Sequence, residues 1–354
     1  MKALIAQAVA RDGGWLPFDR FMALALYAPG LGYYANASRK FGAMPASGSD
    51  FVTAPEMTPL FGRALAAQLG EALQQTRTHE LWEFGAGSGA LAAQLLQALD
   101  ANAVRRYVIV ELSASLRARQ QQALAAHAGR VQWLSELPER FEGVVLGNEV
   151  LDAMPVKLLA RIGGAWHERG VVAADGALRF EDRPTALRPP LEIEGPHDYL
   201  TEIHPQAEAF VRTLADRLTR GAAFFLDYGF PEAEYYHPQR HMGTLMCHRG
   251  HLADPDPLVD PGLKDITAHV DFTGIAVAAQ EAGLATLGYT SQGRFLVNCG
   301  LAAQLADAGL PDRVAGQRLI AEHEMGELFK VLALHKGAYW DALGFGQGDR
   351  THTL

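Results

Sequence analysis

This 354-residue sequence has few cysteines, no long apolar run and no net positive charge. Its two cysteines, Cys247 and Cys299, lie far apart, which argues against a disulfide framework and favours a reducing compartment. No apolar run is long enough to cross a bilayer, and charges at Arg11 and Asp12 soon interrupt the N-terminal one. We therefore expect a cytoplasmic protein without membrane insertion.

The net charge of −9 argues against a protein that binds nucleic acid, because such proteins usually display a strongly basic surface. No metal site is expected either. One segment is rich in histidine, but its spacing matches no standard zinc ligand pattern, and it is interpreted as a polar loop on the substrate side. Its residues are His237, His241, Cys247, His248 and His251.

Short apolar segments alternate with helical patterns through much of the chain, which predicts an α/β fold with a parallel sheet. The expected strands are His79–Phe84, Tyr107–Glu111, Val131–Leu134, Gly143–Asn148, Ala222–Asp227 and Ala285–Tyr289. The expected helices include Ala90–Leu99, Ser113–His127, Pro205–Thr219 and Phe272–Gly283. Between the two groups of strands, Val156–Ile162, Trp166–Val172 and Ala177–Glu181 predict an antiparallel insertion.

These patterns divide the chain into four segments. Residues 1–78 form N-terminal helices and a long loop, and residues 79–155 form the first half of the α/β core. Residues 156–200 are the inserted β subdomain. Residues 201–354 complete the core, with a loop-like stretch at Phe230–Asp271 and a mostly helical C-terminal part.

The turn Glu83-Phe-Gly-Ala-Gly-Ser-Gly89 lies between a predicted strand and a predicted helix. A helix start presents free N–H groups, and glycines let a ligand approach the backbone. Glu83 precedes the first glycine by two residues, where it can accept hydrogen bonds from the amino-acid part of S-adenosylmethionine. Glu111 ends the next strand, where a carboxylate can chelate the ribose hydroxyls.

We therefore predict an S-adenosylmethionine site. The candidate cofactor-binding residues are Glu83, Gly85, Ala86, Gly87, Ser88, Gly89, Glu111, Leu112, Ser113, Asn148, Thr53 and Glu56. An NAD-dependent oxidoreductase is the alternative, because G-x-G-x-x-A with Ala90 also suits a dinucleotide. A second, simpler alternative is that the glycines only form a tight turn between strand and helix and bind no ligand.

Several strings that occur in one order resemble the MidA family, also called DUF185. They include Phe21-Met-Ala-Leu-Ala-Leu-Tyr27, Gly32-Tyr-Tyr34, Asp50-Phe-Val-Thr-Ala-Pro-Glu56, Asn148-Glu-Val-Leu-Asp-Ala-Met-Pro155, Asp227-Tyr-Gly229 and Asp265-Ile-Thr-Ala-His-Val-Asp271. The resemblance implies a Rossmann-like class I S-adenosylmethionine-dependent methyltransferase that acts on a protein arginine. It also implies a complex I subunit as the partner. A non-catalytic complex I assembly factor that binds the donor is a further alternative. His204 departs from the expected small polar residue and puts the substrate in doubt.

Candidate catalytic residues follow the fourth and fifth predicted strands. Glu149 and Asp152 are three residues apart, so a helical turn would place both carboxylates on one side. Such a pair can hold a guanidinium group bidentately. Asp227 ends a strand at the same edge and is the third candidate. Alternatively, Asp152 caps a helix and Glu149 accepts bonds from backbone N–H groups.

The loop Gly48–Glu56 is a candidate lid over the donor. Thr53 and Glu56 are its possible hydrogen-bonding groups. The alternative is an ordered surface loop in which Asp50 and Thr53 form local turns.

Overall fold

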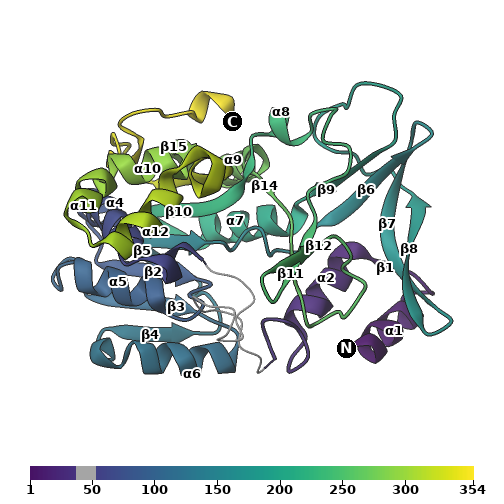
Figure 1. Cartoon of the computed structure of the whole chain (residues 1–354), viewed down its shortest axis with the longest axis horizontal. Coiled ribbons are helices and arrows are strands. Elements are labelled where there is room, and N and C mark those ends of the chain that lie inside the picture. The colour runs from purple at the N-terminus through teal and green to yellow at the C-terminus, as the bar shows by residue number, and fades with distance from the viewer. Residues whose placement is uncertain (37–52) are drawn as a thin grey trace.

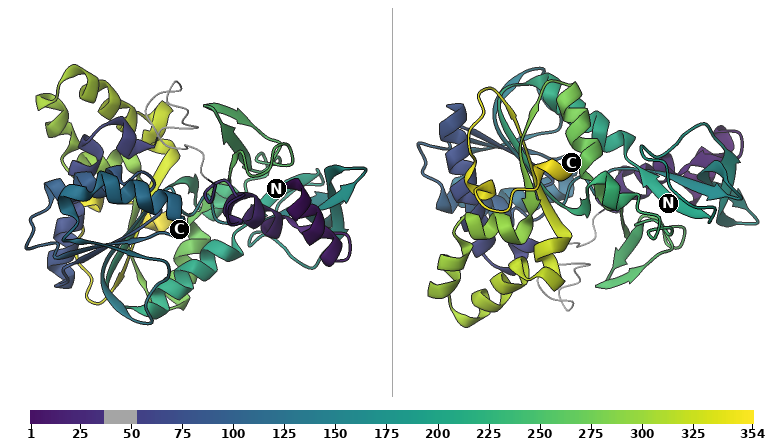
Figure 2. Two further views of the ribbon diagram at one scale, coloured as in Figure 1. Left: turned by 90° about the horizontal axis from the view of Figure 1, so that it is seen from below. Right: turned by 90° about the horizontal axis from the view of Figure 1, so that it is seen from above.

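The structure is a computed structural model that describes residues 1–36 and 53–354, and it has two lobes (Figure 1). Two further views show the lobes side by side (Figure 2). The larger lobe is built on a sheet with the strand order β15-β16-β10-β5-β2-β3-β4, to which β14 adds beside β10. Its strands are β2 (Glu80–Phe84), β3 (Arg106–Val110), β4 (Val131–Leu134), β5 (Phe141–Asn148), β10 (Leu218–Phe230), β14 (Val270–Asp271), β15 (Ala285–Ser291) and β16 (Phe329–Lys336).

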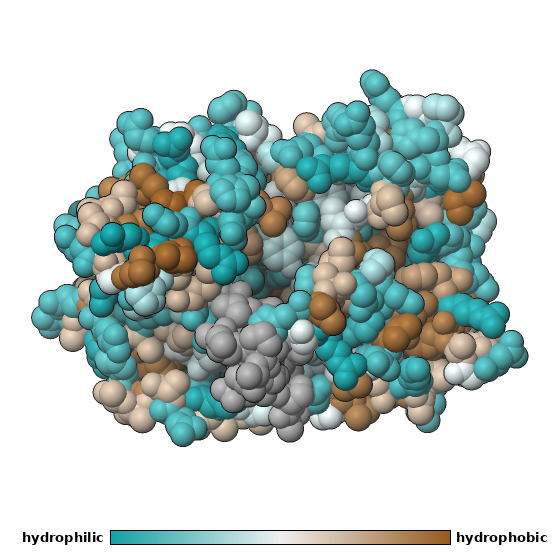
Figure 3. Space-filling view, viewed as in Figure 1, coloured by the Kyte–Doolittle hydropathy of each residue, from teal (hydrophilic) through white to brown (hydrophobic). Residues whose placement is uncertain are grey.

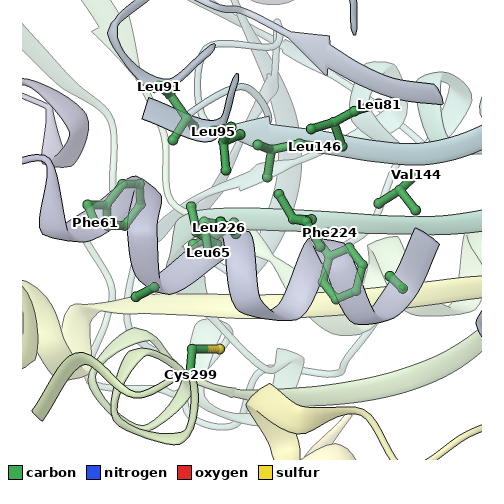
Figure 4. Packing of buried hydrophobic residues seen from close by; sticks show 14 of the residues in the cluster. Phe61, Leu65, Leu81, Leu91, Leu95, Val144, Leu146, Phe224, Leu226 and Cys299 are labelled. Carbon is green, nitrogen blue, oxygen red and sulfur yellow. The ribbon is translucent and has the colours of Figure 1, made fainter. Parts of the chain in front are cut away.

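Strands β4, β3, β2, β5 and β10 are parallel, and β16 runs antiparallel to both β10 and β15. The apolar run of β10 is buried on both faces, as expected for a strand that helices cover from both sides. On one face, α4 packs on α5, and Phe61 and Leu65 of α4 lie in one buried cluster with Leu91, Leu146 and Leu226 (Figure 4). On the opposite face, α7 packs against α9.

The helices of this lobe are α3 (Ala54–Met57), α4 (Leu60–Thr76), α5 (Ala90–Ala98), α6 (Ala114–Ala123), α7 (Pro205–Arg217), α8 (Glu232–Tyr235), α9 (Phe272–Glu281), α10 (Gln292–Asn298), α11 (Leu301–Asp307) and α12 (Leu310–Ile320). Short 3-10 turns cover Ala125–His127, Leu343–Phe345 and Thr351–Thr353, and a π-helical turn covers Glu322–Gly326. No helix in the described ranges is both long and apolar enough to cross a membrane.

The smaller lobe combines segments that are distant in sequence. It contains α1 (Lys2–Arg11), β1 (Leu16–Pro17), α2 (Phe18–Tyr27), β6 (Lys157–Ile162), β7 (Ala165–Ala174), β8 (Ala177–Pro184), β9 (Tyr199–Ile203), β11 (Met246–Arg249), β12 (Leu252–Asp254) and β13 (Asp265–Thr267). One sheet has the order β1-β7-β6-β9, with β8 beside β7, and the other has the order β12-β11-β13. Ile5, Phe21, Leu158, Val171 and Ile266 share one core, which joins the N-terminal helices to both sheets.

The predicted parallel sheet and antiparallel insertion are confirmed, but two parts of the chain were predicted wrongly. Residues 329–336 are strand β16, not helix, and Val331–Leu334 is buried throughout. A short apolar run of this kind cannot be told from a buried helical segment by periodicity. The expected loop Phe230–Asp271 contains α8 and β11–β14. Those strands have two to four residues, too few to show an alternating pattern.

Candidate active site

A cavity of about 1160 Å³ lies at the carboxyl ends of the parallel strands. From β2, the sheet continues through β3 on one side and through β5 on the other, so the topology switches between β2 and β5. Ligands of open α/β sheets bind at such a switch point. Residues of both lobes line the cavity, and the surface between the lobes is hollowed (Figure 3). Its volume exceeds that of a typical pocket for one small ligand.

The glycine turn follows β2 and lines this cavity through Gly85, Ala86, Gly87 and Ser88. Gly85 has a φ of +63°, and a Cβ atom there would lie 2.8 Å from Cγ2 of Val150. A side chain would therefore be strained and would collide with the loop after β5. Gly89 is the N-cap of α5 and lies outside the cavity lining.

Two buried carboxylates flank the turn, and both line the cavity. Glu83 accepts a 2.7 Å hydrogen bond from the hydroxyl of Tyr107, and burial raises the pKa of Glu83 to about 7. Glu111 accepts hydrogen bonds from the N–H of Ser113 at 2.8 Å and from the amide of Gln120 at 3.0 Å. Burial raises the pKa of Glu111 as well. Leu112 and Ser113 continue the same wall.

The segment after β5 brings Asn148, Glu149 and Asp152 to the cavity. Glu149 has a φ of +54° and accepts a 3.0 Å hydrogen bond from the amide of Asn148. Burial, with the neighbouring carboxylate of Asp152, raises the pKa of Glu149 to about 8. Asp152 accepts a hydrogen bond from the hydroxyl of Tyr228, and burial raises its pKa to about 6.

The expected helical turn at Glu149 is wrong, and Asp152 caps no helix. Residues 149–154 form an irregular turn, and Glu149 itself has left-handed backbone geometry. The two carboxylates nevertheless share the cavity. Within the described residues, Oδ1 of Asn148 and Oδ1 of Asp152 have no hydrogen-bond partner, so acceptor capacity remains for a ligand. Glu149 also receives a hydrogen bond from the backbone of Ala54 at the start of α3.

Asp227 lies outside the cavity lining, in contrast to the expectation that it faces the cleft. Strand β10 continues three residues beyond Asp227. The Oδ2 atom of Asp227 accepts hydrogen bonds from three consecutive backbone N–H groups. These belong to Val150 at 3.1 Å, Leu151 at 2.9 Å and Asp152 at 3.3 Å. Asp227 therefore supports the turn that carries Glu149 and Asp152.

Of the predicted lid, residues 48–52 lie outside the described residues. Thr53 and Glu56 line the cavity at α3. The carboxylate of Glu56 accepts a hydrogen bond from the hydroxyl of Ser88 in the glycine turn. The start of α3 is therefore attached to the donor-side wall.

Several cavity residues were not among the predicted site residues, chiefly Tyr27, Tyr34, Tyr228, Asp265 and Thr267. Their motifs occur in the family-like strings, but no spacing signal connects them, because they come from distant parts of the chain.

Of the histidine-rich segment, only His248 lines the cavity. His204 is buried outside it and shares a 2.8 Å hydrogen bond with the carbonyl of His269. In residues 1–36 and 53–354, no cluster of three His, Cys, Asp or Glu side chains suits a metal ion.

The model of the S-adenosyl-L-methionine-dependent methyltransferase family Methyltransf_28 matches residues 62–290, more than half of the chain. The chain belongs to this family. The match spans the glycine turn, both flanking acids and the segment after β5. As a Methyltransf_28 member, the chain is an S-adenosylmethionine-dependent methyltransferase, and an NAD-dependent oxidoreductase is not supported.

Solved structures agree with the assignment to Methyltransf_28. The crystal structure of a COG1565 superfamily member from Burkholderia thailandensis, bound to S-adenosyl-homocysteine, is 52% identical with a TM-score of 0.95. The similarity covers 100% of this chain and 96% of that chain. The cavity suits the same ligand class, because Gly85 leaves no side chain at the turn and buried carboxylates lie on either side.

Curated relatives of this family member include the protein arginine methyltransferase NDUFAF7 of Homo sapiens, which is 27% identical. That similarity covers 92% of this chain and 81% of the relative. The Mus musculus protein of the same name is 29% identical, with 92% and 82% covered.

The expectation of a cytoplasmic location is wrong by this comparison, because both relatives are named mitochondrial. Cys247 and Cys299 are buried free thiols, and they indicate reducing surroundings without identifying a compartment.

Proposed function

We propose that this methyltransferase transfers the methyl group to a guanidinium nitrogen of a protein arginine, and that the substrate is a subunit of respiratory complex I. The names of the curated relatives support the arginine. The complex I subunit rests on the resemblance to the MidA family. The charge of the cavity is the observation that carries the proposal.

The cavity lining is strongly acidic. Among its described residues, Arg217 is the single lysine or arginine, against six carboxyl groups. These are Glu56, Glu83, Glu111, Glu149, Asp152 and Asp265. A partly enclosed acidic site attracts cations, because charges interact more strongly where water is excluded. Both proposed ligands are cationic, since the donor carries a sulfonium and an ammonium group and the acceptor a guanidinium.

The donor-side residues divide by chemistry. Glu83 accepts hydrogen bonds from the donor's ammonium group, and Glu111 accepts them from the ribose hydroxyls. The backbone of Gly85–Ser88 lies against the ligand, and Gly89 sets the start of α5. Leu112, Ser113, Asn148, Thr53 and Glu56 complete the wall around it.

Glu149 and Asp152 act on the acceptor. Their oxygens hold the edge of the guanidinium and draw its positive charge away from the attacking nitrogen. S-adenosylmethionine, when bound, supplies an electrophilic methyl group. The nitrogen forms its bond to the methyl carbon as the carbon–sulfur bond of the donor breaks, which leaves S-adenosylhomocysteine. The nitrogen loses one proton in this step, and Glu149 accepts that proton. Its pKa of about 8 belongs to the ligand-free protein. The cationic donor and acceptor lower that pKa, so Glu149 is ionised and can act as the base near neutral pH when both are bound.

The test uses purified protein, methyl-labelled S-adenosylmethionine and extract from cells that lack the gene. We expect label in methylarginine after hydrolysis of the extract proteins. Glu149→Gln lowers transfer by about 100-fold or more while S-adenosylhomocysteine affinity stays within about threefold. Glu139→Gln is the matched control, because Glu139 is exposed and outside the cavity.

Label in lysine or in nucleic acid overturns the arginine assignment. Unchanged transfer by Glu149→Gln removes Glu149 from the mechanism. For the substrate, the methylarginine content of complex I subunits is compared by mass spectrometry with and without the gene. One site that disappears supports a complex I subunit, whereas an unchanged inventory contradicts it.

A further inference from the structure

We infer that Tyr27 is a specificity-determining residue whose ring stacks on the flat face of the substrate's guanidinium, while the carboxylates of Glu149 and Asp152 bind its edge. The inference rests on the proposed arginine substrate and adds a contact from the smaller lobe. Tyr27 is the last residue of α2 and lines the same cavity as Glu149 and Asp152.

The hydroxyl of Tyr27 is already used within the protein. It donates a 2.8 Å hydrogen bond to the carbonyl of Ala153, in the turn that carries Asp152. This bond joins the end of α2 in the smaller lobe to the catalytic turn of the larger one. This bond therefore holds the ring beside the proposed acceptor site. Because the hydroxyl is bonded within the protein, the part of Tyr27 left to contact a substrate is its aromatic ring.

One face of the Tyr27 ring is covered by protein. The ring of Tyr34 stacks on it, with centroids 5.6 Å apart and an interplanar angle of 19°. Tyr33 in turn packs edge-on against Tyr34 at 5.0 Å. Tyr27 nevertheless leaves 39% of its surface exposed. A fully buried ring such as that of Tyr33 cannot contact a substrate, whereas Tyr27 is exposed at the cavity wall.

A carboxylate fixes the position of this tyrosine pair. The hydroxyl of Tyr34 donates to Asp265 on β13, at 2.9 Å from Oδ1 and 3.0 Å from Oδ2. Asp265 and Tyr34 both line the cavity. Tyr34 and Asp265, which come from two segments distant in sequence, therefore hold the Tyr27 ring on its covered face.

The charges around Tyr27 favour a cation on its ring. Burial of its hydroxyl group raises the pKa of Tyr27, and the carboxylates of Asp265, Asp152 and Glu111 raise it further, so three acids from different elements are near this side chain. An aromatic face attracts cations, and guanidinium stacks on it in a planar manner. A guanidinium bound edge-on by Glu149 and Asp152 has its flat faces free for such a ring.

The experiment measures the affinity of N-acetyl-L-arginine amide for the full-length protein saturated with S-adenosylhomocysteine, by NMR titration at millimolar probe. N-acetyl-L-lysine amide is titrated in parallel. We expect Tyr27→Leu to weaken binding of the arginine probe about tenfold, and Tyr27→Phe to stay within about threefold of the wild type. Tyr339→Leu is the matched control, since Tyr339 is 63% exposed and outside the cavity.

A second comparison separates the ring's charge distribution from its size and does not depend on whether Tyr27→Leu folds. Position 27 carries either phenylalanine or pentafluorophenylalanine, whose face no longer attracts cations. Weaker binding of the arginine probe by the fluorinated ring, with unchanged S-adenosylhomocysteine affinity, supports the inference.

Equal affinity of both rings overturns the inference for Tyr27 and leaves the proposed function intact. A parallel loss of S-adenosylhomocysteine affinity also overturns it, because Tyr27 would then contact the donor. If the wild type binds the lysine probe and not the arginine probe, the proposed arginine substrate fails, and with it this inference.

Discussion

The hydroxyl of Tyr107 on β3 donates a 2.7 Å hydrogen bond to the carboxylate of Glu83 on β2, and both side chains are buried. Burial raises the pKa of Glu83 to about 7, and this hydrogen bond opposes the increase because it stabilises the ionised form. The charge of the proposed donor-binding acid thus depends on a residue that does not line the cavity.

Tyr107→Phe is expected to shift the pH dependence of donor binding. A hydrogen bond to a charged group contributes about 1.5 kcal/mol, so its loss raises the pKa of Glu83 by roughly one unit. Affinity for S-adenosylhomocysteine is expected to increase with pH as Glu83 ionises. In the variant this increase should occur at a higher pH than in the wild type. Calorimetric titrations between pH 6 and 9 measure this, with Tyr339→Phe as the exposed control. Coincident pH profiles of variant and wild type would contradict the role of Glu83.

The donor-side residues could be predicted from sequence because their geometry is local. Glu83, the glycine turn and Glu111 each lie at or beside the end of a strand, so the α/β pattern alone brings them to one edge of the sheet. Glu149 and Asp152 follow β5 in the same manner. Their turn was misjudged because a separation of three residues does not distinguish a helical turn from an irregular one.

The smaller lobe's contribution could not be predicted in this way. Tyr34 and Asp265 meet across 231 positions of sequence, and nothing in their spacing indicates the contact. Asp227 shows a different limit. The end of an apolar run suggested the end of a strand, but β10 continues to Phe230, and pairing with Lys330 of the unpredicted β16 keeps Asp227 inside the sheet.

Gly85→Ala is expected to abolish high-affinity donor binding. The new methyl group would lie 2.8 Å from Val150, at a φ of +63° that alanine rarely adopts. We expect S-adenosylhomocysteine affinity to fall more than about tenfold. Gly13→Ala is the matched control, because Gly13 has a φ of +72° but nothing within 4 Å of the added atom.

The double variant Gly85→Ala, Val150→Ala separates collision from backbone strain at the same position. If the collision dominates, removing the valine methyl groups restores part of the affinity. If the double variant binds no better than the single one, strain at Gly85 accounts for the loss. Wild-type affinity in Gly85→Ala itself would show that the turn does not determine donor binding.

Asp227→Ala is expected to lower both stability and methyl transfer without a direct effect on the donor. It leaves the N–H groups of Val150, Leu151 and Asp152 without their shared acceptor. Each unpaired buried donor costs about 1–3 kcal/mol, and the N–H groups of Leu151 and Asp152 are buried, so we expect a loss of roughly 2–6 kcal/mol in urea unfolding. The kcat falls because the turn with Glu149 and Asp152 moves, while KM for the donor changes little. A donor KM that rises as kcat falls would contradict this positioning role.

Glu149→Gln is expected to make the donor-free protein more stable at alkaline pH although it inactivates the enzyme. Burial raises the pKa of Glu149 from 4.5 to about 8 in the folded state. Below pH 4.5 the carboxyl group is protonated in both the folded and the unfolded protein, so its ionisation does not lower the free energy of unfolding. Between pH 4.5 and 8 it ionises only in the unfolded chain, so wild-type stability falls as the pH rises and levels off above 8.

Glutamine does not ionise, so Glu149→Gln lacks this part of the pH dependence. Since one pKa unit corresponds to about 1.4 kcal/mol, the stability advantage of the variant should grow by roughly 2–3 kcal/mol from pH 5.5 to 8. Urea unfolding at both pH values measures the difference, with Glu139→Gln at an exposed position as the matched control. Parallel wild-type and variant stabilities would mean that Glu149 is already ionised at pH 5.5, and its role as the base near neutral pH would then fail. A widening gap, together with lost transfer, would show a carboxyl group kept at a cost in stability because the chemistry requires it.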